Sequence, residues 1–107
     1  MPADRRTAEF YRDQLADLGD VTISRMFGGW GLRLHGQFLG AILDDVFYLK
    51  VEPFALDAMI AQGGHPFTYT RPSGKRVTIE KWCSVPDDYL DNAASLTEFV
   101  RNMTGVL

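Results

Sequence analysis

Very short links separate four consecutive apolar segments in the first half of the chain, and these links restrict how the segments can pair. The segments are residues 21–27, 30–34, 37–43 and 46–51, and the breaks are Gly28-Gly29, His35-Gly36 and Asp44-Asp45. Parallel strands need a crossover of about a dozen residues or more, whereas antiparallel strands join through tight turns. The sequence therefore predicts an antiparallel meander.

Two helices are expected around this meander. Apolar residues recur at helical spacing near the start of the chain, which predicts a helix over residues 4–18 with Asp4 or Thr7 as its cap. Pro53 suits the first turn of a second helix, and Gly63-Gly64 ends it. Each helix is expected to bury one apolar stripe.

The second half of the chain adds a hairpin and further helical segments. Residues 66–71 and 76–82 flank Pro72-Ser73-Gly74, a strong turn signal, and an amphipathic helix follows with Asn92 or Ser95 as its cap. The expected class is α+β: an antiparallel sheet of about five to six strands, with helices mainly on one face. The expected order is roughly α-β-β-β-β-α-β-β-α-α.

Alternation within the strands predicts which side chains share a face. Residues 30–34 read as a half-buried strand, because Trp30, Leu32 and Leu34 alternate with smaller or polar residues. In the fourth strand, Phe47, Leu49 and Val51 face one way, and Val46, Tyr48 and Lys50 face the other.

Length and composition favour one cytoplasmic domain over residues 1–107. The length suits a single domain, and the net charge of −3 argues against indiscriminate binding to nucleic acid. Cys83 is the single cysteine, so no intrachain disulfide can form. The start of the chain is polar, and no run of about twenty apolar residues is present, so we expect neither a signal peptide nor a membrane span.

The glycine cluster at Gly28, Gly29 and Gly31 invites comparison with phosphate-binding loops, but neither template fits. A dinucleotide fingerprint starting at Gly29 needs glycine at position 34, which is Leu34, and no Gly-Lys-Ser/Thr ending of a P-loop is present. The cluster is interpreted as structural. At least one of the three glycines is expected to have positive φ or to lie where a Cβ would clash.

No reactive constellation stands out in the sequence. Cys83 beside His35 or His65 would need a geometry that the sequence does not reveal, and Cys83 at the end of a strand is expected to be buried and not catalytic. The histidines and the cysteine lack paired metal-ligand spacing, so neither metal nor cofactor is expected. The doublets Asp44-Asp45 and Asp87-Asp88 are typical of turns and helix caps.

Basic residues on or beside the predicted strands are a better lead to function. The candidate interaction surface consists of Arg33, Lys50, Arg71, Lys75 and Arg76, and the aromatic residues among them are Trp30, Tyr48, Phe67, Tyr69 and Trp82. Basic and aromatic residues on a sheet face can stack the bases of single-stranded nucleic acid. The same pattern is typical of a solvated sheet above buried aromatic residues.

Several segments together resemble the N-terminal domain of the TfoX/Sxy family, bacterial proteins associated with regulation of competence genes. The most specific match is Met26-Phe27-Gly28-Gly29-Trp30-Gly31-Leu32, and the resemblance extends over about residues 15–100. The other matching pieces are Gly36 ahead of Phe38, Phe47-Tyr48-Leu49-Lys50-Val51, Pro66-Phe67-Thr68-Tyr69 with Gly74-Lys75, and Val85-Pro86 leading to Leu90-Asp91. Arg33 and His35 depart from the family, which commonly has an aromatic and an acidic residue there.

The resemblance implies an antiparallel sheet with flanking helices, a regulatory or interaction role, and no known catalysis. Full-length members also carry a helical C-terminal domain. The resemblance in this chain covers only the N-terminal domain, which is therefore expected to stand alone. Three hypotheses remain, in this order: association with a protein partner, including a homodimer; binding of nucleic acid; and a small enzyme using Cys83 or the aspartate doublets.

Overall fold

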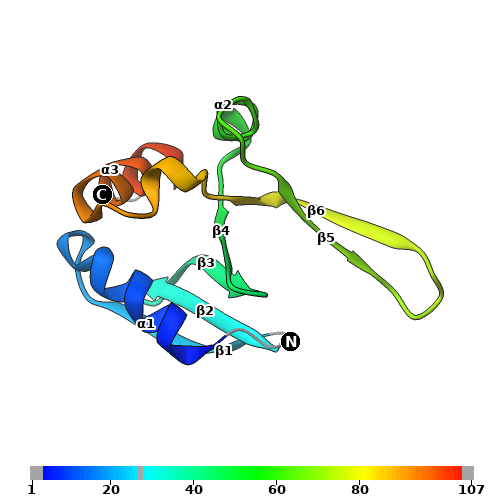
Figure 1. The fold of residues 1–107 in the computed structure, drawn as a ribbon, viewed down its shortest axis with the longest axis horizontal. Coiled ribbons are helices and arrows are strands. Elements are labelled where there is room, and N and C mark those ends of the chain that lie inside the picture. Colours follow the sequence, from blue (N-terminus) through cyan, green and yellow to red (C-terminus); the bar gives the residue numbers. More distant parts are fainter. Residues whose placement is uncertain (1–3, 27, 105–107) are drawn as a thin grey trace.

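The computed structural model describes residues 4–26 and 28–104, and Figure 1 shows their arrangement as helices around one antiparallel sheet. Within these residues the sheet has six strands in the spatial order β1-β2-β3-β4-β6-β5. The strands are β1 Val21–Met26, β2 Gly29–Leu34, β3 Gln37–Leu43, β4 Val46–Lys50, β5 Pro66–Thr70 and β6 Arg76–Ser84, and the helices are α1 Arg5–Gln14, α2 Pro53–Ala61 and α3 Ala93–Thr104. The predicted class and element order are confirmed.

Two of the tight turns owe their shape to residues with positive φ. His35 and Gly36 have φ of 52° and 80°, and Asp44 and Asp45 have φ of 50° and 62°. Positive φ at both central residues matches the twist of a two-residue β-hairpin, and Asn, Asp and Gly adopt it most readily. The predicted turns between β2, β3 and β4 are therefore confirmed.

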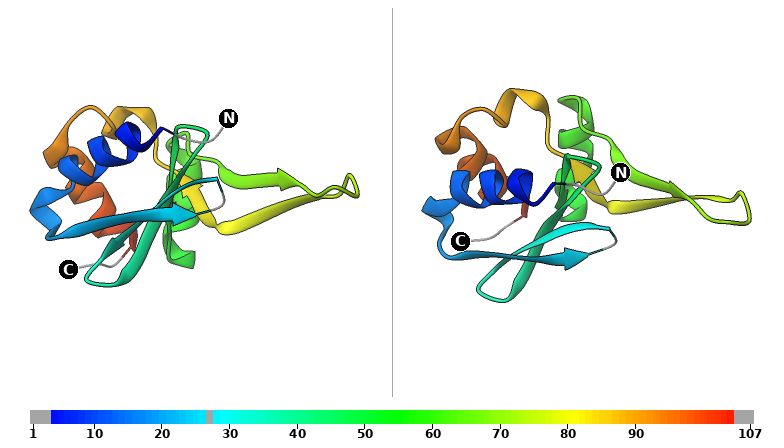
Figure 2. Two further views of the ribbon diagram at one scale, coloured as in Figure 1. Left: turned by 90° about the horizontal axis from the view of Figure 1, so that it is seen from below. Right: turned by 60° about the horizontal axis from the view of Figure 1, so that its bottom comes forward.

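One face of the sheet carries the main core, and all three helices of the described residues pack on it. Ala8, Met59 and Leu96, from α1, α2 and α3, are fully buried in one cluster with Leu32 and Phe47 of the strands. Figure 2 shows α1 and α3 on the same side of β1 and β2, whereas the β5–β6 hairpin projects away from the helices. No helix within the described ranges is long and apolar enough to cross a membrane.

The first helix is shorter than predicted. α1 ends at Gln14, and a 3-10 turn over Ala16–Leu18 follows it. The change begins at Leu15, whose N–H reaches the carbonyl oxygens of both Tyr11 and Arg12, at 3.0 and 3.2 Å. Such shared bonds are common where the last turn of a helix tightens. The prediction of one helix through residue 18 is therefore wrong in its final turn.

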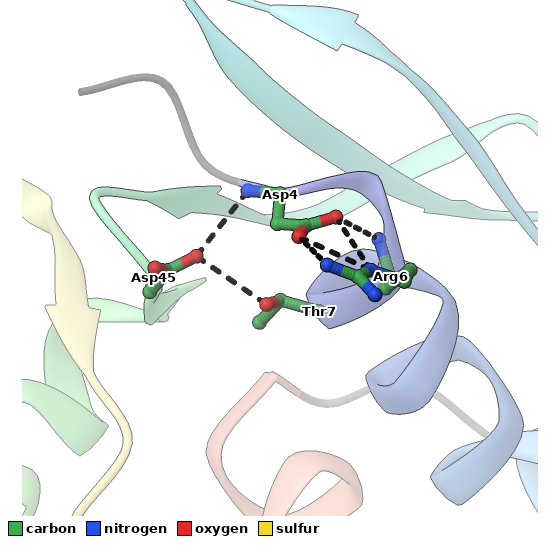
Figure 3. A network of polar contacts seen from close by, with 4 residues as sticks. All are labelled: Asp4, Arg6, Thr7 and Asp45. Atoms are coloured by element: carbon green, nitrogen blue, oxygen red, sulfur yellow. Dashed lines mark hydrogen bonds and ion pairs between the residues drawn. The ribbon is translucent and has the colours of Figure 1, made fainter.

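Polar contacts tie α1 to distant parts of the chain. Asp4 caps the helix by accepting the N–H of Arg6 at 2.9 Å, and Asp45 accepts hydrogen bonds from the Asp4 N–H and the Thr7 hydroxyl, both at 3.3 Å (Figure 3). At the other end of α1, the Thr97 hydroxyl of α3 donates to the carbonyl oxygen of Gln14 at 3.3 Å. These bonds satisfy backbone groups that a helix terminus leaves open.

Strand β2 differs from its half-buried prediction only around Gly31, where both faces are covered, whereas Arg33 is exposed as expected. Leu32 and Leu34 are buried on the helix side as expected, but Gly31 is buried on the other side. A Cβ placed on Gly31 would lie 3.1 Å from Met26 Sδ and 3.6 Å from the Phe38 ring. The second face of the sheet therefore carries an apolar cluster of its own.

A bulge in β3 divides its side chains between the two faces. Leu32 pairs with Gly40 and Arg33 pairs with Phe38, so Leu39 is an extra residue in β3. As a result Leu39 and Ile42, three residues apart, both pack in the main core, while Phe38 and Ala41 both pack on the second face. An extra residue of this kind breaks strict alternation and bends the strand.

Candidate functional site

The second face of the sheet is built by strand residues alone within the described part of the chain. Its buried members are Ala41, Leu43 and Tyr48, and half-buried aromatic rings pack against them. We use the term aromatic face for five side chains that extend from the middle of the sheet onto the projecting hairpin: Phe38 of β3, Tyr48 of β4, Phe67 and Tyr69 of β5, and Trp82 of β6.

The rings of the aromatic face contact one another in a continuous row. The ring centroids of Phe38 and Trp82 are 5.5 Å apart, those of Trp82 and Phe67 are 6.0 Å apart, and those of Phe67 and Tyr69 are 5.9 Å apart. Tyr48 adds an edge contact to Phe67 at 5.1 Å. Pairs with this spacing each contribute about 0.5–1.5 kcal/mol beyond the area they bury, so the rings hold one another in place.

Exposure increases along this row toward the hairpin. Tyr48 is only 8% exposed, whereas Phe38, Phe67 and Trp82 are half-buried and Tyr69 is 38% exposed. Burial raises the pKa of the Tyr48 hydroxyl, and the charge of Asp44 adds to the effect. Tyr48 thus lies beneath the other rings, and those rings have surface that a partner could contact.

An irregular register between β5 and β6 brings the hairpin rings onto this face. Pro66 pairs with Cys83, but the next residue, Phe67, pairs with Ile79. Residues 80–82 of β6 therefore have no partner on β5. This break allows Phe67, on the hairpin side of it, to contact the rings of both Tyr48 and Trp82 on the sheet side.

Cations lie near both ends of the row. The Arg33 guanidinium is 5.7 Å from the Phe38 ring centroid, and Lys50 pairs with Trp82 across β4 and β6, which places it on the same face. At the hairpin end, the backbone N–H of Arg71 donates to the backbone carbonyl oxygen of Lys75 at 2.8 Å, so the two residues lie opposite each other. Within residues 4–26 and 28–104, none of these four side chains forms an ion pair.

A hollow of about 370 Å³ adjoins the aromatic face beside Phe38. Lys50, Lys81 and the acidic Glu52 line it together with Gln37 and Thr104. A second hollow, of about 400 Å³, lies at the other end of β4 and is acidic, with Asp45, Asp87 and Asp88 at its rim. In the part of the chain that the structure describes, no group of three His, Cys, Asp or Glu side chains could hold a metal ion.

Comparison with protein families gives a match over most of the chain. The model described as the TfoX N-terminal domain matches residues 13–104. The chain belongs to this family. The resemblance predicted from the sequence is therefore confirmed, while no curated protein matches the chain.

The glycines of the TfoX N-terminal domain motif have the structural roles predicted for them. Gly28 has a φ of 77°, in the turn between β1 and β2. A Cβ on Gly29 would overlap the carbonyl oxygen of Ile42, and one on Gly31 would press on Met26. Phe27, in the same motif, lies outside the described residues.

Trp30 of this TfoX N-terminal domain does not join the aromatic face, although the sequence grouped it with the strand aromatics. Alternation places it on the helix side, where it is buried, and the guanidinium groups of Arg5 and Arg25 each lie 5.3 Å from its ring centroid. Arg76 is also separate: it pairs with Thr70, on the hairpin face opposite Tyr69. The structure thus groups Arg33, Lys50, Arg71 and Lys75 with the rings.

Cys83 and the two histidines, the candidate catalytic residues, form no hydrogen-bonded pair within the described residues. Cys83 is fully buried on the helix side, and burial raises the pKa of its thiol, which disfavours the reactive thiolate. In the described ranges no hydrogen bond joins Cys83 to His35 or His65. The backbone N–H of His65 donates to Ser84 Oγ at 2.9 Å, and the imidazole ring lies against Tyr48.

Sequence reasoning missed Phe38 as a member of the aromatic face of the TfoX N-terminal domain. Phe38 and Ala41 are three residues apart, so strict alternation would place them on opposite faces. The bulge at Leu39 places them on one face. The sequence does not reveal this bulge, because its extra residue, Leu39, is of a type that is common in regular strands.

Proposed function

We propose that this TfoX N-terminal domain is a non-enzymatic interaction domain that acts by binding another protein through its aromatic face. The observation that carries the proposal is the row of mutually packed rings on a sheet face that no described helix covers. An apolar surface of this kind, flanked by cations, is typical of an interaction site.

The composition of the aromatic face supports a protein partner. Tyr, Trp, Phe and Arg are enriched in the cores of protein interfaces, and the most energetic contacts come from such rings. Rings already held by their neighbours lose little conformational freedom when a partner binds. Tyr69, Trp82 and Arg33 are accordingly the expected main contacts.

We further propose a regulatory role, in competence or transcription, on the basis of the resemblance to the TfoX/Sxy regulators. The domain would act there by holding a partner protein. The arrangement of Cys83 and the histidines gives no support to a catalytic alternative.

Affinity capture from a cell lysate, with and without nuclease, tests the proposal when combined with surface variants. We expect Tyr69→Ala and Arg33→Ala to lose the captured protein, and nuclease to leave it bound. Phe54→Ala is the matched control, because Phe54 is a 72% exposed ring on α2, a helix that packs on the other face of the sheet. Loss of capture with Phe54→Ala alone would place the site elsewhere.

Nucleic acid is the second candidate partner, and one observation favours it. Lys50 and Lys81 line a hollow beside Phe38, so cations and rings do share one part of the surface. The net charge of −3 opposes this reading. Titration of labelled single- and double-stranded DNA at two salt concentrations tests it. Sub-micromolar binding that weakens steeply with salt would promote nucleic acid above protein.

A further inference from the structure

The outer edge of β5 is open, and its central residues carry no charge that would protect the edge. β5 is the last strand in the sheet order, and its residues Phe67, Thr68, Tyr69 and Thr70 are uncharged and favour strands. Charged residues on an edge strand discourage pairing with other chains. The opposite edge, β1, carries such a charge at Arg25.

The hydrogen bonding of the hairpin identifies which backbone groups of β5 point outward. The Arg71 N–H donates to Lys75 across the hairpin, so Tyr69 and Phe67, at two-residue steps, also point toward β6. Thr68 and Thr70 therefore direct their N–H and C=O groups away from the sheet. In the described part of the chain, no backbone group of another element bonds to them.

The sequence around this edge is symmetric in its hydrogen-bonding capacity. Pro66 and Pro72 each lie three residues from Tyr69, and neither has an N–H to donate. An antiparallel pairing of β5 with its own copy, centred on Tyr69, sets Thr68 opposite Thr70 and each proline opposite the other. If the pairing were centred on Thr68 or Thr70 instead, a proline of one copy would lie opposite a threonine of the other. The threonine carbonyl oxygen would then have no N–H to accept from.

We propose that two copies of this domain associate by pairing β5 with β5, antiparallel, about a two-fold axis at Tyr69. The inference rests on the proposed function, since it names a second copy of the chain as a protein partner. The N–H and C=O groups of Thr68 and Thr70 in each copy would bond to those of the other, which joins the two sheets edge to edge.

The side chains suit the same register. On the aromatic side, Tyr69 meets its own copy, and Phe67 lies opposite Arg71 of the second copy, where a cation can sit over a ring. The two Arg71 side chains would be about 13 Å apart along the strands. That separation exceeds the Debye length of about 8 Å at physiological salt, so their repulsion is screened.

The expected dimer is weak. Five strand residues and a few rings bury less than the roughly 800 Å² per partner of a stable interface, so association depends on concentration. The dimer is isologous, which limits the assembly to two copies through this edge. Extended rows of chains are not expected.

Cysteine cross-linking reads the register directly. In the proposed pairing Tyr69 occupies a close, non-hydrogen-bonded position with Cα atoms about 4.5 Å apart, which a disulfide can bridge. We expect Tyr69→Cys to form a covalent dimer under mild oxidation, and Thr68→Cys alone or Thr70→Cys alone to form little. The double variant Thr68→Cys/Thr70→Cys should cross-link. Native Cys83 is buried and does not interfere.

Sedimentation of the unmodified chain and of Thr68→Pro, from about 10 μM to about 1 mM, tests the association itself. Proline removes the outward N–H of Thr68 without breaking a backbone hydrogen bond to β6, although it also removes the exposed hydroxyl contact of Thr68 with Thr78 at 3.2 Å. The variant should therefore fold and remain monomeric. A parent chain that stays monomeric throughout, or equal cross-linking at positions 68 and 69, overturns the proposal. A monomeric chain that still captures a protein through Tyr69 leaves the proposed function standing.

Discussion

Gly29 occupies a position that no side chain can share. A Cβ there would overlap the Ile42 carbonyl oxygen, which belongs to the neighbouring strand and cannot move aside. Gly28 needs only its positive φ, and the Cβ of an alanine at Gly31 would meet the flexible end of Met26. The three glycines of one motif are therefore required for different reasons.

Alanine at each glycine should separate these reasons. We expect Gly29→Ala to cost more than about 2 kcal/mol of unfolding free energy, because backbone must shift. Gly28→Ala should cost about 1 kcal/mol for its left-handed φ, and Gly31→Ala should cost least. Urea denaturation of the three variants measures this order. Losses under about 0.5 kcal/mol at all three positions would contradict a structural role.

The buried thiol of Cys83 predicts a pH dependence of stability. Burial raises its pKa in the folded chain, so above the ordinary thiol pKa of about 8.5 the unfolded chain loses this proton first. Stability from this group is complete below that pH and falls as pH rises through it. We expect the unfolding free energy to decline from pH 8 to pH 10, and Cys83→Ala to decline less steeply. An equal slope in the variant would contradict the assignment.

At the scale of elements, residue type predicted turns and alternation predicted faces. His35-Gly36 and Asp44-Asp45 were predictable because positive φ suits those residues, and Phe47 and Leu49 were predictable as core because β4 alternates strictly. The bulge at Leu39 and the break at residues 80–82 were not, since they arise from how neighbouring strands fit together. The aromatic face depends on both irregularities, so the sequence revealed most of its rings but not their grouping.

The cap of α3 offers a test at the same scale. Asn92 Oδ1 accepts the N–H of Ser95 at 2.9 Å, which identifies Asn92 as the cap that the sequence left open between two residues. We expect Asn92→Ala to lower the unfolding free energy by about 1 kcal/mol. Asn102→Ala, at an exposed position in the same helix, is the control and should change it little. A larger loss from Asn102→Ala would contradict this reading.

At the scale of the whole molecule, the described part of the chain has a helix-covered core at one end and an uncovered two-stranded hairpin at the other. The main core joins the three helices to the strands, whereas the hairpin beyond Phe67 consists of two strands with no helix against them (Figure 1). An isolated two-stranded hairpin is marginally stable in water. The projecting hairpin is accordingly the part of the fold that a bound partner would stabilise most.

Hydrogen exchange should show this difference. In dilute solution we expect the Tyr69 and Val77 amides to exchange much faster than those of β3 and β4, because opening the hairpin disturbs little else. Raising the protein concentration should slow exchange at Thr68 and Thr70, whose outward groups would then be paired. Hairpin amides as well protected as those of β4 at every concentration would contradict the expected local weakness.

The hydrogen bonds that α3 donates to the end of α1 and to the following 3-10 turn can form only late in synthesis of the chain. The carbonyl oxygen of Gln14 accepts a hydrogen bond from the Thr97 hydroxyl, and that of Asp17 accepts one from the Arg101 guanidinium. These donors lie 83 and 84 residues further along the chain. At about 5–20 residues per second, a ribosome needs roughly 4–17 s to add that stretch. During this interval the first helix lacks the groups that complete it, and its apolar stripe has no α3 to pack against.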